Sequence, residues 1–296
     1  MEITSQPLRL NLSMIILLLM IAMFLLFPLR LTALTMYCIG YAHYLLAIYY
    51  SRRGIQSAWS SRRSKWLLLA MLPLAFLPFL ANDPEYVVLG LVIYFGFHHA
   101  MSEVYFDAKR HSKRFRTFHW WAVLGSYFAI TGHHMPTFLH TETIGWVVSI
   151  VATTALLVVW KKEGEFSLRY VIHTCPWLLL GPAVAVIGEF VYLDWRFLIN
   201  WHFFFWLFIP HLRKGMFTPR KIRIYWAQNA VLIGFFAFLF YSANVGSSTD
   251  VMDFSVIGTL VLSQFFLAWS YFHISWSFLV SGGNPGWLKK WVSSVK

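Results

Sequence analysis

Apolar runs of about twenty residues recur along almost the whole chain, separated by short polar connections. A run of this length is what an α-helix needs to cross about 30 Å of hydrocarbon. Only 12% of the 296 residues are charged, which is about half the usual fraction of a soluble domain. We predict spans at residues 11–29, 31–50, 66–82, 85–106, 118–138, 142–160, 169–192, 195–212, 222–243 and 254–281. The expected fold is all-α, a polytopic transmembrane helical bundle of about ten spans that forms a single integral-membrane domain over residues 1–296.

The charges of the connections alternate along the chain. Basic groups follow the second, fourth, sixth and eighth predicted spans, beginning at Arg52, Lys109, Lys161 and Arg213. The intervening connections contain acidic residues, among them Asp83, Glu142, Asp194 and Asp250. Because basic loops stay in the cytoplasm, we expect both termini to be cytoplasmic. The net charge of +12 then reflects topology and contact with anionic lipid headgroups, and we expect no nucleic-acid partner.

Twelve histidines are many for so apolar a chain. Among them, His43, His98, His99, His202 and His273 lie inside the second, fourth, eighth and tenth predicted spans. An ionisable side chain inside a membrane is costly and usually functional. Imidazole is also the commonest side-chain ligand for iron, copper and zinc. The estimated depths of these residues overlap, so imidazoles from separate helices could converge on one metal ion. Alternatively, each histidine bonds to a neighbouring backbone or hydroxyl group.

Glu103 follows His99 by one helical turn and should share its helix face. We therefore regard Glu103 as a catalytic candidate that orients an imidazole or ligates the metal directly. The alternative is an ion pair with Lys109 or Arg110 at the membrane surface.

The two histidine pairs of the chain, His98-His99 and His133-His134, lack a third histidine three residues upstream. They therefore differ from the H-x-x-H-H boxes of membrane desaturases and alkane hydroxylases. His133 and His134 could form a second metal site toward the opposite face of the membrane, although a polar helix end also explains them. The chain contains no Gly-rich phosphate loop, no G-x-S-x-G elbow and no H-E-x-x-H pair.

Three short elements of the sequence carry a likeness to a known family. They are Gly40-Tyr41-Ala42-His43, Gly96-Phe97-His98-His99 and Asn200-Trp201-His202. With their spacing and the small, almost loopless chain, they resemble the bacterioopsin-related-protein family of membrane β-carotene oxygenases. The resemblance implies a non-haem Fe(II) held by histidines, and cleavage of carotene to retinal with dioxygen.

The resemblance also implies a ligand set, namely His43, His98 or His99, and His202. The family has another histidine one turn after His202, where this chain has Trp206. His273 could supply the fourth ligand instead.

We therefore expect a mononuclear iron-dependent dioxygenase in a bacterial inner membrane, acting on an apolar lipid or carotenoid. Two other functions stay open. One is a different histidine-ligated, lipid-modifying metalloenzyme, such as a desaturase or hydroxylase with two metals. The other is a non-enzymatic transporter or haem-binding membrane protein.

Overall fold

A computed structural model describes most of the chain, and every regular element in the described residues is a helix. The described ranges are 6–27, 29–60, 62–80, 84–105, 112–134, 141–163, 172–173, 175–188, 190–191, 196–212, 217–246 and 263–280. The helices are α1 (Gln6–Leu26), α2 (Leu29–Ser60), α3 (Arg62–Leu80), α4 (Pro84–Tyr105), α5 (Lys113–His134), α6 (Thr141–Lys162), α8 (Trp177–Gly188), α9 (Arg196–Leu207), α10 (Ile209–Leu212), α11 (Pro219–Gly246) and α13 (Ser263–Val280). The predicted all-α class is confirmed for these residues.

Among the described residues, five helices are long and apolar enough to cross a membrane, which makes the chain a helical membrane protein. The apolar segments are Arg9–Leu26, Leu31–Gln56, Tyr86–Val104, Glu142–Lys162 and Pro219–Ser242. Each predicted span overlaps a helix, and α9 and α10 share the eighth span. The full count of ten spans and the cytoplasmic termini stay predictions.

Several helices extend further into the polar connections than the predicted spans do. α2 continues through Arg52 and Arg53 to Ser60, because arginine ends an apolar segment while remaining a good helix former. α5 begins before the predicted span, where Ser112 Oγ accepts a hydrogen bond from the Phe115 amide at 3.1 Å. This hydroxyl cap satisfies one of the free amides of the first helical turn.

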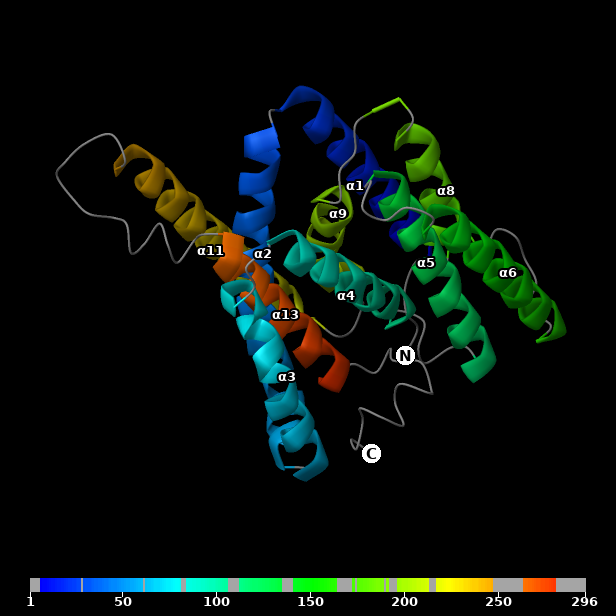
Figure 1. The fold of residues 1–296 in the computed structure, drawn as a ribbon, viewed down its shortest axis with the longest axis horizontal. Helices are drawn as coiled ribbons and strands as arrows, with labels where there is room; N and C mark the ends of the chain where they lie inside the picture. The colour runs from blue at the N-terminus through cyan, green and yellow to red at the C-terminus, as the bar shows by residue number, and fades with distance from the viewer. Residues whose placement is uncertain are drawn as a thin grey trace.

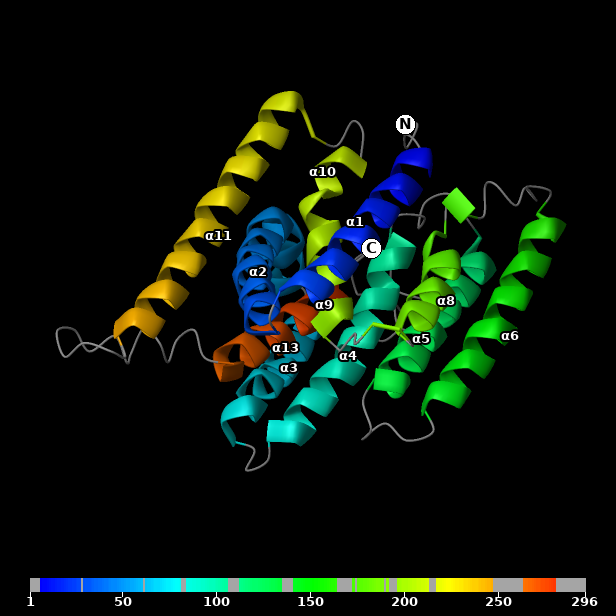
Figure 2. The ribbon, with the colours of Figure 1, turned by 90° about the horizontal axis from the view of Figure 1, so that it is seen from above.

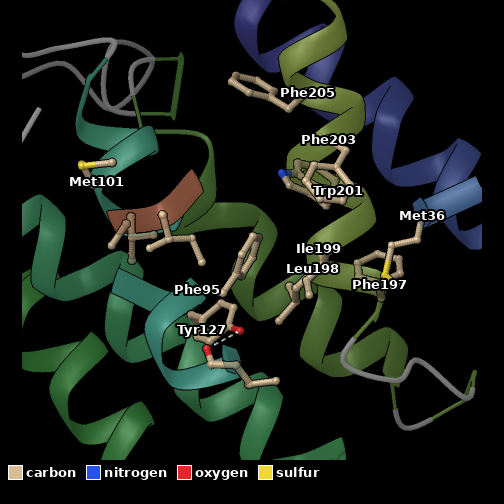
Figure 3. Packing of buried hydrophobic residues seen from close by; sticks show 14 of the residues in the cluster. Met36, Phe95, Met101, Tyr127, Phe197, Leu198, Ile199, Trp201, Phe203 and Phe205 are labelled. Carbon is tan, nitrogen blue, oxygen red and sulfur yellow. Dashed lines mark hydrogen bonds between the residues drawn. The ribbon is translucent and has the colours of Figure 1, made fainter. Parts of the chain in front are cut away.

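The helices that matter for the site lie in the middle of the bundle. α11 lies at one edge and α6 at the other, with α2, α4, α9 and α13 between them (Figures 1 and 2). α2 packs against α9, α11 and α13, and α13 also contacts α4. Figure 3 shows Trp201 and Phe203 of α9 and Phe95 of α4 in this packing, and all three are buried. The central core is thus built from large apolar side chains of helices distant in the sequence.

α5 and α6 approach each other closely through two glycines. A Cβ atom on Gly125 would lie 2.5 Å from the Ser149 backbone nitrogen, and one on Gly145 would press against the backbone of Ala129. The hydroxyls of Ser126 and Ser149 are 2.7 Å apart across the same contact. Small residues let membrane helices pack backbone to backbone, with hydroxyls bonding between them.

Gly145→Ala should therefore destabilise the protein by about 1–3 kcal/mol, because helix backbone must move to admit the methyl group. The matched control is Gly234→Ala in α11, where an added Cβ meets nothing within 4 Å. That change should be neutral or stabilise by up to about 1 kcal/mol, since alanine favours the helix. Thermal unfolding in detergent, followed by circular dichroism, measures both. Equal stability of the two variants would contradict the close α5–α6 contact.

Candidate metal centre

Four buried histidines from four helices meet at one point of the central core. His43 comes from α2, His98 from α4, His202 from α9 and His273 from α13. Each is at most 8% exposed. The nitrogen ligand atoms of His43, His202 and His273 all lie within 4.8 Å of one another, so these three residues can hold a metal ion.

The distances between the ring nitrogens fit ligands of one ion. Nε2 of His43 lies 3.2 Å from Nε2 of His273, and Nε2 of His98 lies 3.2 Å from Nε2 of His202. Two nitrogens bound at about 2.1 Å to one ion, with an angle of about 90–110° between them, lie about 3.0–3.4 Å apart. The His98 and His273 rings, with centroids 5.1 Å apart, connect the two pairs. His98 therefore lies directly beside the triad of His43, His202 and His273, in contact with two of its members.

Aromatic rings hold these imidazoles in place. The Trp206 ring lies 5.7 Å from that of His43 and 6.0 Å from that of His202. The Tyr44 ring packs 4.9 Å from His273. Metal-bound histidines usually donate their second nitrogen to an acceptor, but Nδ1 of His98 and of His273 has no hydrogen-bond partner among the described residues. Ring packing therefore orients the His273 imidazole.

The Tyr44 hydroxyl connects the two helices that carry His43 and His273. It lies 2.6 Å from the Ser270 hydroxyl, in a hydrogen bond between α2 and α13. Each partner is in the same helix as one of the histidines, because Tyr44 follows His43 directly and Ser270 precedes His273 by one turn. The bond therefore sets the register of the two helices that carry His43 and His273.

A cavity of about 320 Å³ opens beside the histidines. His43, His98 and His273 line its buried end, and the outer part includes the half-exposed Tyr50. Most of the wall between is apolar, from Leu46, Ala47, Met101, Trp206 and Ile209. Such a space suits an apolar ligand that reaches the histidines.

His99 lies beside this group and faces another part of the core. Its ring centroid is 6.3 Å from that of His202, and it packs edge-on against Trp177 at 4.6 Å. Neither of its ring nitrogens has a hydrogen-bond partner among the described residues. Adjacent helix residues point about 100° apart, which explains why His98 joins the centre while His99 contacts the aromatic core. Its predicted role as a ligand stays a prediction.

The carboxylate of Glu103 pairs with an arginine of the first helix. Arg9 Nη2 donates to Glu103 Oε2 at 2.7 Å and to the Glu103 backbone carbonyl at 3.2 Å. Both side chains are buried. The sequence suggested an imidazole, Lys109 or Arg110 as the partner, and the last two lie outside the described residues. The catalytic role of Glu103 stays a prediction, and the observed pair links α1 to the helix that carries His98.

Other predicted residues contribute less. The side chains of His133 and His134 lie outside the described part of the chain, so the second metal site stays a prediction. The exposed His211 accepts a hydrogen bond from Trp226 Nε1 at 3.0 Å. Sequence reasoning did not select Tyr44, because one aromatic residue among so many carries no signal of its own. Trp206 was noted only as the residue that stands where the family has a further histidine, and its ring contacts with His43 and His202 were not expected.

Comparison of the chain with protein-family models, with curated proteins and with solved structures gave no match. The chemistry of the centre therefore follows from its own residues.

We expect purified protein expressed with iron to contain about one metal ion per chain, and His98→Ala to lose most of it. Mutation of a residue that only supports a ligand typically lowers metal affinity by about 10–100-fold, and loss of a direct ligand should lower it further. His99→Ala, which changes the neighbouring residue, should retain the ion. Metal analysis by mass spectrometry checks both variants. Loss of the metal in His99→Ala and its retention in His98→Ala would reverse the assignment.

Arg9→Met should lower the free energy of unfolding by about 3 kcal/mol or more, because it removes the cation beside a buried carboxylate. The double variant Arg9→Met/Glu103→Gln removes both charges and should be more stable than Arg9→Met alone. Thermal unfolding in detergent of the wild type, of Arg9→Met, of Glu103→Gln and of the double variant gives a double-mutant cycle, which measures the interaction between the two side chains. Strictly additive effects would show that the two side chains do not stabilise each other.

Proposed function

We propose that this protein is a membrane oxygenase that holds one non-haem Fe(II) ion and cleaves a long apolar polyene, such as β-carotene, to retinal with dioxygen. The observation that carries the proposal is the position of the histidines. His43, His98 and His273 form the buried end of a mostly apolar cavity, and His202 completes the group. An ion held there would face a dry space that fits a hydrocarbon chain.

The choice of Fe(II) rests on the donor atoms and on the reaction. Neutral imidazoles suit iron, copper, nickel and zinc, but zinc has no redox chemistry. Fe(II) with open coordination positions supplies the activation of dioxygen that polyene cleavage needs. The likeness to the bacterioopsin-related-protein family also favours iron, and it leads us to place the protein in a bacterial inner membrane.

The proposed reaction needs no external reductant. One carbon–carbon double bond breaks, each of its carbons receives one oxygen atom of the same dioxygen molecule, and two carbonyl groups form. Central cleavage of β-carotene therefore gives two molecules of retinal. The four imidazoles would hold the ion, Trp206 and Tyr44 pack against their rings, and the apolar wall would position the polyene and exclude water.

The spacing of the imidazoles favours this function over haem binding. Two axial histidines lie on opposite sides of a haem, with nitrogens about 4 Å apart, twice a metal–nitrogen bond of about 2 Å. The Nε2 atoms of both histidine pairs are 3.2 Å apart, which leaves no room for a porphyrin between them. The single group of four imidazoles likewise suits one ion better than two.

Iron-loaded protein should convert β-carotene to retinal, and His202→Ala should reduce the rate more than about 100-fold while the protein still inserts into the membrane. His211→Ala is the matched control, because His211 is an exposed histidine after the same helix and bonds to Trp226. Chromatography of the products, with and without dioxygen, measures the rate and its dependence on dioxygen. A fully active His202→Ala protein would refute the site, and retinal formed at an undiminished rate without dioxygen would refute dioxygen as the oxidant.

A further inference from the structure

One face of α2 lines the cavity from its buried end to its outer end. The residues on this face are His43, Leu46, Ala47, Tyr50, Ser51 and Gly54. They recur every three or four positions, as residues on one side of a helix do. His43 is 8% exposed and Tyr50 is 40% exposed. The cavity wall therefore runs from the buried end to the outer end as the residue number increases along α2.

The polarity changes at Ser51, beyond the apolar section. Trp276 Nε1 donates a hydrogen bond to Ser51 Oγ at 3.0 Å, from α13 to α2. The Ser51 hydroxyl donates in turn to the backbone carbonyl of Ala47 in its own helix. A hydroxyl oxygen accepts two hydrogen bonds, so one acceptor position of Ser51 Oγ is left for a ligand. Both side chains line the cavity.

The cavity wall contains no Asp, Glu, Lys or Arg among the described residues. Arg52, which follows Ser51, lies 4.5 Å from the centre of the Tyr49 ring and donates to the Tyr49 carbonyl. An anionic ligand group inside the cavity would lose its water without gaining a cation. An uncharged hydroxyl can instead donate to the remaining acceptor position of Ser51 Oγ.

We propose that the substrate is a long apolar molecule with an uncharged hydroxyl near one end, and that this hydroxyl donates a hydrogen bond to Ser51 Oγ, which Trp276 Nε1 holds in position. This inference rests on the proposed function, because it takes the cavity as the substrate site. Ser51 follows His43 by two turns of α2, about 12 Å along the helix axis. The reacting double bond is therefore held at about that distance from the polar end.

The first test compares two polyenes that differ by one hydroxyl. β-Carotene and β-cryptoxanthin, which is β-carotene with one added ring hydroxyl, are titrated into wild-type protein in detergent without oxygen, so that no turnover occurs. Quenching of tryptophan fluorescence reports binding. We expect β-cryptoxanthin to bind about tenfold more tightly, the usual effect of one additional net hydrogen bond.

A second pair tests the charge of the end group. Retinol and retinoic acid share one chain and differ at the terminal group, and retinol should bind more tightly because the wall offers no cation. Tighter binding of the acid would overturn the uncharged end group.

Variants of Ser51 and Trp276 test where the substrate hydroxyl binds. In Ser51→Ala/Trp276→Phe, the affinity ratio of β-cryptoxanthin to β-carotene should fall to about one. In Ser126→Ala, which changes a buried serine outside the cavity wall, the ratio should stay near the wild-type value. Equal binding of the two carotenoids to wild-type protein, or a ratio unchanged in the double variant, would overturn this inference and leave the oxygenase proposal intact. Failure of both to bind wild-type protein would instead overturn the polyene function itself, and the inference with it.

Discussion

Imidazole nitrogens in the middle of a membrane bundle have no water to hydrogen-bond with, so their partners must be other groups of the bundle or a metal ion. Four such rings in this protein face one another, at Nε2 separations of 3.2 Å within each pair. A polar group without a hydrogen-bond partner in hydrocarbon costs several kcal/mol of free energy. The arrangement of α2, α4, α9 and α13 depends on this constraint, because a rotation of any one helix would direct its imidazole into apolar packing.

Hydroxyl groups hold these helices at the required rotation. The Tyr127 hydroxyl of α5 donates to the Val92 carbonyl of α4 at 2.9 Å, as Figure 3 shows, and the Tyr271 hydroxyl of α13 donates to the Val87 carbonyl at 2.9 Å. Tyr94 of α4 donates to Ser275 of α13 at 3.0 Å. α4, which carries His98, is thus attached on two sides by tyrosines. Each bond satisfies a polar group that has no water to bind and sets the position of the helix along its axis.

Much of the helical architecture follows from the sequence, because apolar length and loop charge are local signals. The selection of His43, His98, His202 and His273 as ligand candidates also rested on local signals, since each is an ionisable residue inside an apolar run. The distinction between His98 and His99 could not be made in this way, because it depends on which helix faces each side of α4. The Arg9–Glu103 pair joins residues 94 positions apart, and no local pattern pairs a residue before the first predicted span with one in the fourth.

The order of the donors along the chain has a consequence for biogenesis. His43 and His273 are 230 positions apart, and His98 and His202 lie between them. During synthesis α2 emerges first and α13 last, so a nascent chain offers an incomplete ligand set until α13 reaches its place beside α2 and α4. An ion bound at this site would therefore gain its full ligand set only at the final stage of insertion. A chain in which α13 fails to pack beside α2 and α4 would hold such an ion with one imidazole fewer.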